Sequence, residues 1–368
     1  MRTGKEAGRP SRNFAGDNLH TLTITHKLLS FTGTAVDAIE DACAESWIVE
    51  PALKQRVQPS IYLPGDLDRV TDAIEFSNLP QEMEYLTAEV RNHAATVAYR
   101  FRNVSVVEGG LYSGRWRERL MTRAKAEADN GPEKRMRSGV VACSWTGNHF
   151  FGHWITDDLT LHLAAEEIGH PFILKRKPYL HEPGYRRLLN IWCDQVACTR
   201  FDEVVVLRDF GQNAYKRKRY EILRNQLKDQ FRLRRAKRVL LRRGSLGVSR
   251  EIVNNSEFET FLIAHGFDIV DPEKLTPSEI IEQTMGAEVV IGVEGSQIPH
   301  ALLTMADKGV LCCLLPPFRF VNTFKGYTDC LGMRYAMLVG HAAPGGFRID
   351  LDDLGHLLEK IDTELARQ

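Results

Sequence analysis

The C-terminal third of the chain alternates short apolar runs with segments of helical periodicity. The runs at 238–241, 267–270, 289–293 and 310–315 are β-branched or otherwise apolar, which predicts buried strands. Between the first two, apolar residues recur at helical spacing. Strands that alternate with helices predict a parallel sheet with helices on its faces.

One of these strands leads directly into a turn that contains glycine. The run 289–293 is followed by Glu294-Gly295-Ser296, and an apolar helical pattern then continues to Leu303. A strand, a tight loop and a helix N-terminus would favour phosphate or carboxylate, through free N–H groups and the helix dipole. The spacing is not the dinucleotide glycine fingerprint, and no lysine follows as in a P-loop. The alternative is a strand-to-helix corner that binds nothing.

The middle of the chain shows a similar alternation. Strands are predicted at 139–145, 171–174 and 203–207, with helices at 153–163 and 184–198. This pattern again favours a parallel sheet. The segment 19–140 gives weaker signals, and few elements can be placed there.

His153 and Asp157 are four residues apart and therefore share one face of the helix predicted at 153–163. Such a pair can act as a general base. The alternatives are that His153 is a core histidine bonded to a carbonyl, and that Asp157 only orients it. A zinc site at His149 and His153 is disfavoured, because Phe150 stands where metallopeptidases place a glutamate.

The composition is that of a globular protein of enzyme size. The chain has 368 residues, so two domains are expected, and Lys plus Arg (48) equals Asp plus Glu (48), so the overall charge argues neither for nor against a polyanionic partner. The seven cysteines form no CxxC pair, which fits a reducing compartment. Neither a signal peptide nor a membrane-spanning run is evident, so a cytoplasmic location is expected. We divide the chain into a disordered tail at 1–18 and domains at 19–232 and 233–368.

Several polar residues follow the predicted C-terminal strands. Ligands of open parallel sheets bind outside the carboxyl ends of the strands, and guanidinium groups facing a helix N-terminus suit a diphosphate. Successive strand residues point to opposite faces, so only one of two neighbouring arginines should reach it. The residues expected at this rim are Arg242, Arg243, Glu294, Gly295, Ser296 and Arg319.

Three motifs make the chain resemble glycosyltransferase family 61 over about residues 145–340. Residues 152–159 (GHWITDDL) are similar to that family's Gly/Tyr-His-Trp-x-x-Asp-x-Leu stretch. Residues 240–244 (LLRRG), with Asn255 and Glu257 downstream, resemble its strand-Arg-Arg element and the Asn-Glu after it. Residues 267–273 (FDIVDPE) and 289–303 resemble its last two motifs. The chain looks like a bacterial capsule-type branch of the family.

The chain departs from the family pattern in the loop after the third strand. Glu294 stands where most members carry histidine, and Ser296 where alanine is usual. A carboxylate would repel a diphosphate unless it faced a sugar hydroxyl or an arginine. Our interpretation is that Glu294 contacts the donor sugar or ribose, and that His300 replaces part of the missing imidazole.

The resemblance implies an α/β protein of GT-B architecture, with two Rossmann-like domains facing across a cleft. It implies an inverting transferase that needs no metal or other cofactor and moves a sugar from a nucleotide diphosphate sugar to a glycan or other hydroxyl acceptor. His153 and Asp157 are the catalytic candidates. The donor-site candidates are Arg242, Arg243, Gly244, Asn255, Glu294, Gly295, Ser296, His300 and Arg319. The alternative function is a catalytically silent relative that binds carbohydrate or nucleotide.

A basic segment at 216–238 raises the question of other partners. It could contact nucleic acid or an anionic membrane surface, but aromatic residues are few there and a solvated helix face is the commoner explanation. We therefore expect no nucleic acid partner. Peripheral contact with a membrane remains a second hypothesis, since a capsule-type acceptor could be linked to lipid.

Overall fold

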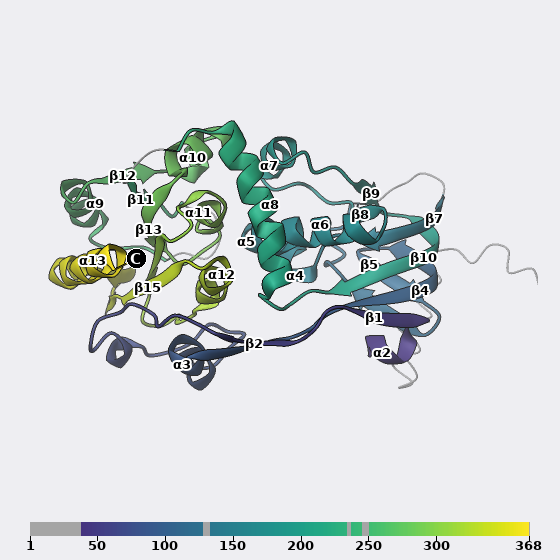
Figure 1. Ribbon diagram of the computed structural model, residues 1–368, viewed down its shortest axis with the longest axis horizontal. Coiled ribbons are helices and arrows are strands. Elements are labelled where there is room, and N and C mark those ends of the chain that lie inside the picture. Colours follow the sequence, from purple (N-terminus) through teal and green to yellow (C-terminus); the bar gives the residue numbers. More distant parts are fainter. Residues whose placement is uncertain (1–37, 128–132, 234–236, 245–249, 368) are drawn as a thin grey trace, which may run out of the picture.

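The protein is an α/β structure with two large sheets that lie side by side along its long axis (Figure 1). The computed structural model describes residues 38–127, 133–233, 237–244 and 250–367. The tail predicted at 1–18 lies outside the described residues. The α/β class is the one predicted from the alternation of strands and helices.

The first sheet is mixed, with strand order β6-β5-β4-β10-β7-β8-β9 and β1 paired to β4. The pairs β10–β7, β7–β8 and β8–β9 are parallel, as predicted for this region, but β10–β4 and the pairs beyond it are antiparallel. Short turns join β4, β5 and β6, and such turns permit only antiparallel pairing. The strands are β1 (Glu45–Glu50), β4 (Thr96–Val107), β5 (Gly110–Ser113), β6 (Trp116–Arg119), β7 (Lys134–Val141), β8 (Pro171–Leu174), β9 (Asp194–Val196) and β10 (Thr199–Arg208).

The helix predicted at 184–198 is shorter than expected. It ends at Leu188, and the segment Asp194–Val196 forms edge strand β9 instead. The remaining elements of this half are α2 (Ile39–Ala42), β2 (Leu53–Arg56), η1 (Leu67–Arg69), α3 (Leu79–Thr87), β3 (Val90–His93), α4 (Trp145–His149), α5 (Phe151–His153), the π-helical turn η2 (Trp154–Asp158), α6 (Leu159–Ile168), α7 (Glu182–Leu188) and α8 (Ala214–Gln230).

The second sheet is parallel throughout, in the order β12-β11-β13-β14-β15. Numbered along the chain this is 2-1-3-4-5, a doubly wound order whose direction reverses between β11 and β13. The strands are β11 (Lys237–Leu241), β12 (Phe267–Val270), β13 (Ala287–Val293), β14 (Val310–Leu315) and β15 (Arg334–Val339). The other elements are α9 (Asn255–Ala264), η3 (Pro272–Lys274), α10 (Pro277–Thr284), α11 (Pro299–Thr304), α12 (Thr323–Leu331), β16 (His341–Ala343), β17 (Gly346–Arg348) and α13 (Leu351–Ala366).

Alternate residues of the parallel strands enter two different cores. Leu240 and Ile291 pack with α9 and α13 on one face, whereas Leu241 and Val290 pack with α10, α11 and α12 on the other. The second core continues into the first half of the chain through side chains such as Trp154 and those of α7 and α8. In Figure 1, α8 crosses between the two sheets. One continuous apolar core therefore joins the second sheet to helices of the first half.

The N-terminal segment also reaches the second sheet. Ile61 forms a parallel bridge with Ala336 of β15, and Ala73 forms another with Phe320. The carboxylate of Glu82 in α3 accepts hydrogen bonds from the backbone N–H and the side-chain amide of Asn322. Part of the predicted 19–232 domain thus packs on the sheet of the 233–368 domain.

Candidate active site

The donor-side candidates lie at the carboxyl ends of β11 and β13, where the strand order reverses. Doubly wound proteins bind their ligands at this place. Arg243 follows β11 and Glu294 follows β13. Nη1 of Arg243 lies 3.4 Å from the carbonyl oxygen of Glu294 and 3.3 Å from the side-chain oxygen of Gln297.

Three arginines surround Glu294. Nη1 of Arg250 lies 2.8 Å from its Oε2, and Nε of Arg319 lies 3.9 Å from the same oxygen, while Arg243 contacts its backbone. Glu294 therefore faces guanidinium groups, one of the two arrangements that the sequence allowed for a carboxylate at this position. Burial lowers the pKa of Arg250 to about 10, with Arg243 and Arg319 adding to the effect and Glu294 opposing it. Burial also lowers the pKa of Arg243. We call Arg243, Arg250 and Arg319 the arginine cluster.

The arginine cluster contains hydrogen-bond donors that are available to a ligand. Within the described chain, the buried Nε–H groups of Arg250 and Arg319 have no hydrogen-bond acceptor. Buried donors normally find a partner, and guanidinium groups pair well with phosphate oxygens. An anion with several oxygens would satisfy both groups.

The loop between β13 and α11 is crowded rather than open. A Cβ atom at Gly295 would collide with Nη1 of Arg243 and lie 3.0 Å from Nη1 of Arg250, so a side chain there would displace these guanidinium groups. The helix begins at Pro299, three residues later than Ser296. Gly295 and Ser296 therefore precede the helix and do not supply its first free N–H groups. Guanidinium groups, not a helix terminus, provide the positive charge here.

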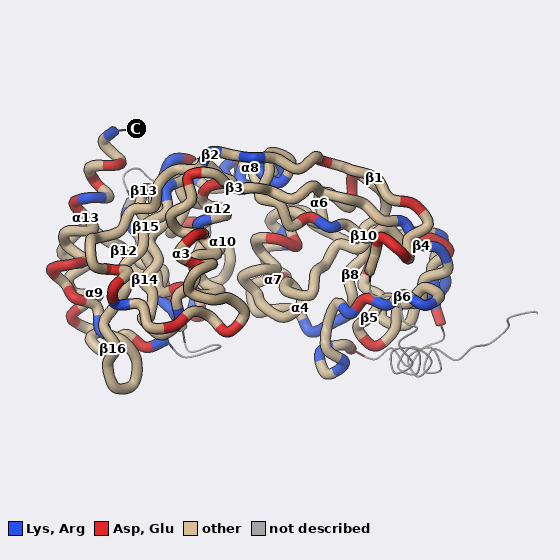
Figure 2. The backbone as a smooth tube through the Cα atoms, turned by 90° about the horizontal axis from the view of Figure 1, so that it is seen from below, with Lys and Arg blue, Asp and Glu red and all other residues tan. Residues whose placement is uncertain are grey.

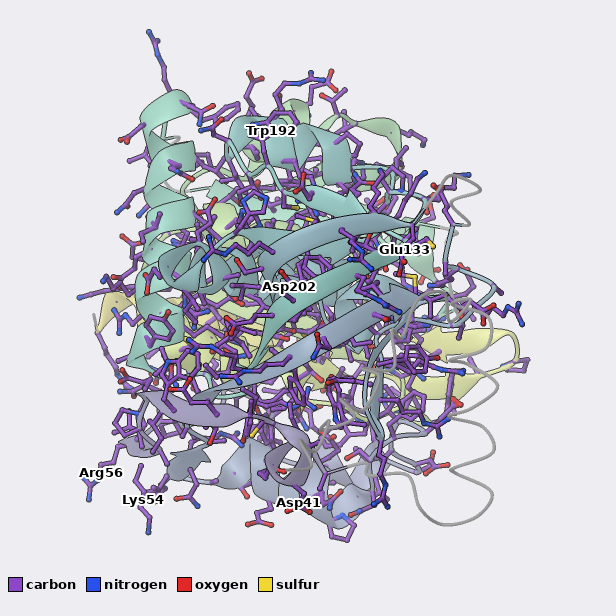
Figure 3. The ribbon with its side chains drawn as sticks, turned by 90° about the vertical axis from the view of Figure 1, so that its right-hand side faces the viewer. Asp41, Lys54, Arg56, Glu133, Trp192 and Asp202 are labelled. Atoms are coloured by element: carbon purple, nitrogen blue, oxygen red, sulfur yellow. The ribbon has the colours of Figure 1, made fainter. Side chains whose placement is uncertain are left out.

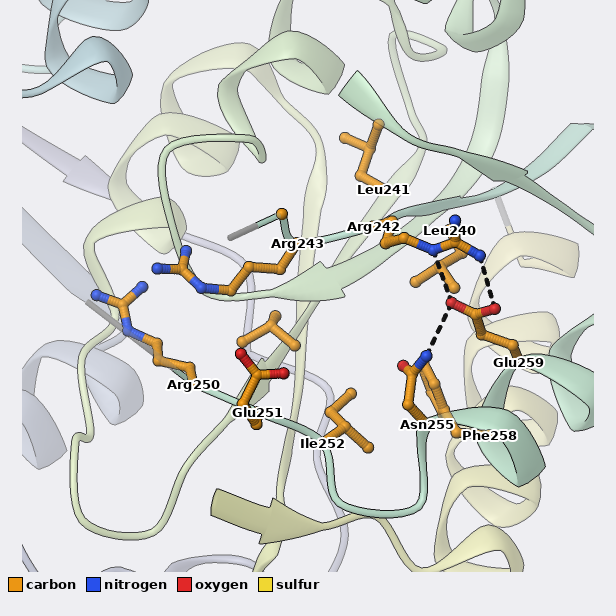
Figure 4. Close-up of a pocket in the computed structure, with 12 residues that line it drawn as sticks. Leu240, Leu241, Arg242, Arg243, Arg250, Glu251, Ile252, Asn255, Phe258 and Glu259 are labelled. Carbon is orange, nitrogen blue, oxygen red and sulfur yellow. Dashed lines mark hydrogen bonds and ion pairs between the residues drawn. The ribbon is translucent and has the colours of Figure 1, made fainter. Parts of the chain in front are cut away.

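Arg242 and Asn255 lie in a separate arrangement on the other side of β11 (Figure 4). Arg242 pairs with both carboxylate oxygens of Glu259, at 2.8 and 2.7 Å, and with Asp271 at 3.3 Å. The Asn255 amide donates to Glu259 at 3.1 Å. The alternation of side chains along the strand separates Arg242 from Arg243, so their charges act in different places.

A cavity of about 140 Å³ lies between these two arrangements. Figure 4 shows Arg243 and Arg250 on one side of it and the Arg242–Glu259 pair on the other. Gly244 forms part of the lining, and a Cβ atom there would collide with the carboxylate of Glu273. The cavity is lined by Leu240, Leu241, Arg242, Arg243, Gly244, Arg250, Glu251, Ile252, Asn255, Phe258, Glu259 and Val293.

His153 and Asp157 form a hydrogen-bonded pair on the other half of the molecule. Nδ1–H of His153 donates to Oδ2 of Asp157 at 2.8 Å. Burial opposes the charged imidazolium, but the hydrogen bond and the charge of Asp157 outweigh it and raise the pKa of His153. The His153 side chain is 34% exposed, and its Nε2 has no hydrogen-bond partner in the described chain. Nε2 is therefore the atom that can take a proton.

Asp157 itself is not free to act as a base. Burial would raise its pKa, but the charge of Lys216 and hydrogen bonds from His153 and Tyr327 hold this pKa well below the usual range. The geometry makes Asp157 the orienting partner of His153, one of the two roles that the sequence left open. The pair spans the junction of α5 and η2, and π-helical turns occur frequently at functional sites.

The pair lies next to the Glu294 loop. A Cβ atom at Gly152, the residue before His153, would be 3.3 Å from Cα and Oγ of Ser296. Gly152 thus packs directly against the residue that follows Gly295. The tertiary structure brings the histidine and the arginine cluster to the same place, although they are about 90 to 170 residues apart in sequence.

His300 is not at this place but in the core. It is buried, and the Tyr185 hydroxyl donates to its Nδ1 at 2.6 Å. Its ring packs against Phe151 and His181. Burial, with a smaller contribution from His181, lowers the pKa of His300 to about 3, so its imidazole is neutral at physiological pH. The structure shows no contact between His300 and Glu294.

Exposed aromatic rings lie in the segment that precedes His153. The Trp145 ring is tilted against that of His149, with 3.9 Å between the ring centroids, and Phe150 lies 6.2 Å from the ring of His153. Trp145 is 40% exposed and Phe150 is 49% exposed. The buried side chain of Asn148 fixes this segment, because it donates to the carbonyl of Leu120 and accepts from Arg176.

Local sequence patterns carry no signal for three of the residues found here. Arg250 lies on a loop without periodicity, and Lys216 is one of many cations in a basic helix. Tyr327 lies on α12, far from the other residues in sequence. Their proximity to the candidates follows from tertiary packing alone.

The basic helix α8 presents less charge to solvent than its sequence implied. Figure 2 marks its Lys and Arg residues in blue, but Lys216, Arg219 and Arg224 are buried and bonded within the protein. The membrane-contact hypothesis then rests on exposed cations such as Arg217 and Lys218. No helix among the described residues has the length and apolarity needed to cross a bilayer. The described residues also contain no group of three or more metal-ligating His, Cys, Asp or Glu side chains.

The fold and these residues define an α/β protein with a cationic pocket and an adjoining histidine. Residues 151–312, somewhat less than half of the chain, match the family model described as Glycosyltransferase 61. This match supports a glycosyltransferase. The matched region includes His153, Asp157, Arg243, Arg250 and Glu294, and no curated protein matches the chain.

Proposed function

We propose that the protein transfers a sugar from a nucleotide diphosphate sugar to a hydroxyl group of a glycan or other acceptor, with inversion at the anomeric carbon. The observation that carries this proposal is the juxtaposition of the arginine cluster with the His153–Asp157 pair, through the contact of Gly152 with Ser296. The cluster supplies cations for a diphosphate, and the pair supplies a base. Two α/β halves that meet at this site agree with a GT-B arrangement.

The proposed reaction uses His153 as a general base. Nε2 of His153 takes the proton of the acceptor hydroxyl. At the same time the hydroxyl oxygen forms a bond to the anomeric carbon, from the side opposite the leaving group. The bond from that carbon to the diphosphate oxygen breaks, and the diphosphate keeps the electron pair. Direct displacement of this kind inverts the anomeric centre.

The arginine cluster would stabilise the leaving diphosphate. Preorganised cations and donors in a water-poor site stabilise developing negative charge strongly, because they need no rearrangement during the reaction. Arg250 and Arg319 are already oriented by Glu294. The proposed enzyme therefore uses arginines where other transferases use a divalent metal, and needs no other cofactor.

The exposed rings beside His153 support an acceptor that contains a sugar. Aromatic rings on a rigid segment suit the apolar face of a pyranose, and Trp145 and Phe150 are exposed next to the proposed base. This observation favours a saccharide over a small alcohol as acceptor. A polysaccharide of the capsule type fits this description and is our proposal for the product.

Melting of the purified protein with a panel of nucleoside diphosphates and nucleotide sugars, in EDTA and with added Mg²⁺ or Mn²⁺, tests the donor site. A ligand that binds only the folded state raises the melting temperature. We expect a shift that survives EDTA and is lost in Arg243→Ala. If no compound shifts the melting temperature, the donor-site assignment is wrong.

Turnover distinguishes the enzyme from a silent binding relative. His153→Ala should abolish sugar transfer while the nucleotide-dependent melting shift remains. A wild-type protein that binds nucleotide but transfers no sugar from any donor of the panel would favour the silent relative.

A further inference from the structure

Asp157 is bonded on both carboxylate oxygens, and its partners come from three parts of the chain. Oδ2 accepts from Nδ1–H of His153 at 2.8 Å and from the Tyr327 hydroxyl at 2.7 Å. Oδ1 lies 3.4 Å from Nζ of Lys216. The hydroxyl of neighbouring Thr156 adds a longer contact of 3.3 Å. The carboxylate therefore has little freedom to rotate.

The two partners outside the His153 segment are buried and belong to different elements. Lys216 lies on α8 and is 1% exposed, and Tyr327 lies on α12 of the second sheet and is 5% exposed. Burying an ammonium group and a phenol hydroxyl is costly unless each finds partners. The Lys216 ammonium group and the Tyr327 hydroxyl both donate a hydrogen bond to the Asp157 carboxylate.

Lys216 is also held by Asp209. Its Nζ donates to the carbonyl oxygen of Asp209 at 2.7 Å and lies 3.6 Å from Oδ2 of that residue. Arg219 pairs with both Asp209 oxygens, at 2.8 and 2.9 Å. The ammonium group is therefore fixed between two carboxylates, with Asp157 on the side of the candidate base.

We infer that Lys216 and Tyr327 are positioning residues for the base: they fix the Asp157 carboxylate so that it accepts Nδ1–H of His153 and leaves the lone pair of Nε2 for the acceptor hydroxyl. The inference rests on the proposed role of His153. Because Tyr327 comes from the second sheet, the base is completely oriented only where the two halves of the molecule meet.

The charges around His153 give this arrangement a second effect. Burial disfavours the imidazolium, whereas Asp157 and, more weakly, Asp158 favour it. Lys216 opposes them, and Tyr327 shares the Asp157 carboxylate without adding charge. Lys216 therefore limits the rise in the pKa of His153, which keeps more of the base in its neutral form near pH 7.

The test is a ¹⁵N NMR titration of the histidine side chains in the full-length protein, with no ligand added. His153 is assigned from the signal that is lost in His153→Gln. Lys216→Met should shift the His153 titration midpoint upward, because an opposing positive charge is removed. Tyr327→Phe should lower the fraction of the Nδ1–H tautomer, because the carboxylate is less firmly held.

Tyr335→Phe is the matched control, since Tyr335 is also a buried tyrosine with a side-chain hydrogen bond, to Asn322. It should leave both properties of His153 unchanged. An unchanged midpoint in Lys216→Met, or an unchanged tautomer ratio in Tyr327→Phe, removes that residue from the inference. Lys216→Arg retains the charge and should keep the wild-type midpoint. If Lys216→Met does not fold, Lys216→Gln also removes the charge and takes its place, with the same upward shift expected.

Kinetics separate this inference from the proposed function. If both are right, Tyr327→Phe lowers kcat roughly 10-fold or more with little change in the donor KM, since misplacing a catalytic group slows the chemical step. If His153 is not the base, the NMR changes appear but the pH dependence of kcat does not follow them. If the inference is wrong, the NMR signals of His153 do not change in these variants.

Discussion

The arginines that surround Glu294 explain why a carboxylate can lie next to a site for an anion. Alone, its carboxylate would repel a diphosphate, but it lies 2.8 Å from Arg250 and 3.9 Å from Arg319. It therefore reduces the repulsion between guanidinium groups that lie close together before a ligand arrives. The same pairing orients these groups, so that a bound diphosphate need not arrange them.

Replacing Arg250 should weaken nucleotide binding far more than replacing Arg242. A hydrogen bond to a charged group contributes about 1.5–3 kcal/mol, so Arg250→Gln should raise the Kd for a nucleoside diphosphate by roughly 10- to 100-fold. Arg242 is already paired with Glu259 and Asp271, so Arg242→Gln should change the Kd little. Isothermal titration calorimetry measures both. Equal losses in the two variants would contradict the separation of the two arginines.

The pH dependence of kcat/KM should report His153, because this ratio reflects the free enzyme. The base works only as neutral imidazole, and the pKa of His153 is raised above its ordinary value of 6.5 by Asp157, despite burial. The value of kcat/KM should therefore fall as the pH decreases through a midpoint above 6.5. Rate measurements at subsaturating substrate between pH 5 and 9 test this. An acid limb centred below 6.5 would argue against His153 as the base.

At the scale of elements, the segment from α4 to η2 brings exposed rings and the base together. Trp145 lies on α4, Phe150 joins α4 to α5, and His153 ends α5 just before the π-helical turn. A π turn adds a residue to the helical turn, which changes the direction of the side chains that follow. The buried Asn148 contacts make this segment rigid.

The rings should affect the acceptor and not the donor. Contacts with an aromatic ring typically contribute about 0.5–1.5 kcal/mol, so Trp145→Ala and Phe150→Ala should each raise the acceptor KM by roughly 2- to 10-fold. The Kd for the nucleotide should stay unchanged. Trp192 is the control: it is 64% exposed and lies at the edge of the first half, as Figure 3 shows. If Trp192→Ala has the same effect, the rings near His153 have no special role.

At the scale of the whole molecule, helix α8 joins the two sheets. Arg224 of this helix donates to the carbonyl oxygens of Leu302 and Met305 at the end of α11, and pairs with Asp307 at 2.8 Å. The apolar core around α8 contains side chains from both halves. The site lies on this junction, so its geometry depends on how the halves pack.

We expect the described part of the chain to unfold in a single transition that Arg224 stabilises. Arg224→Met leaves two buried carbonyl groups without donors, which should cost about 2–4 kcal/mol. Arg217→Met on the same helix is the control, because Arg217 is 49% exposed and pairs only within the helix. Urea unfolding followed by circular dichroism and by tryptophan fluorescence measures both. Two separate transitions would show that the halves unfold independently.

The pattern of apolar residues was sufficient to predict much of the second sheet. The strands expected at 267–270 and 310–315 are β12 and β14, because buried parallel strands require continuous apolar runs and the turns between them are local. The His153–Asp157 pair was also predictable, since helical spacing alone places these residues on one face. The position of Arg243 and Glu294 at the strand ends followed from the same local pattern.

Other features depended on contacts that no local pattern contains. The antiparallel part of the first sheet depends on which strands pair, and the core position of His300 depends on Tyr185 and His181, which are far away in sequence. Arg250, Lys216 and Tyr327 reach the site only because α8, α12 and the strand ends of β11 and β13 pack together. The sequence by itself thus determined the family resemblance, the α/β class and the local pair, because these depend on neighbouring residues. The tertiary structure decided which charges surround Asp157 and Glu294, because burial and proximity depend on the whole chain.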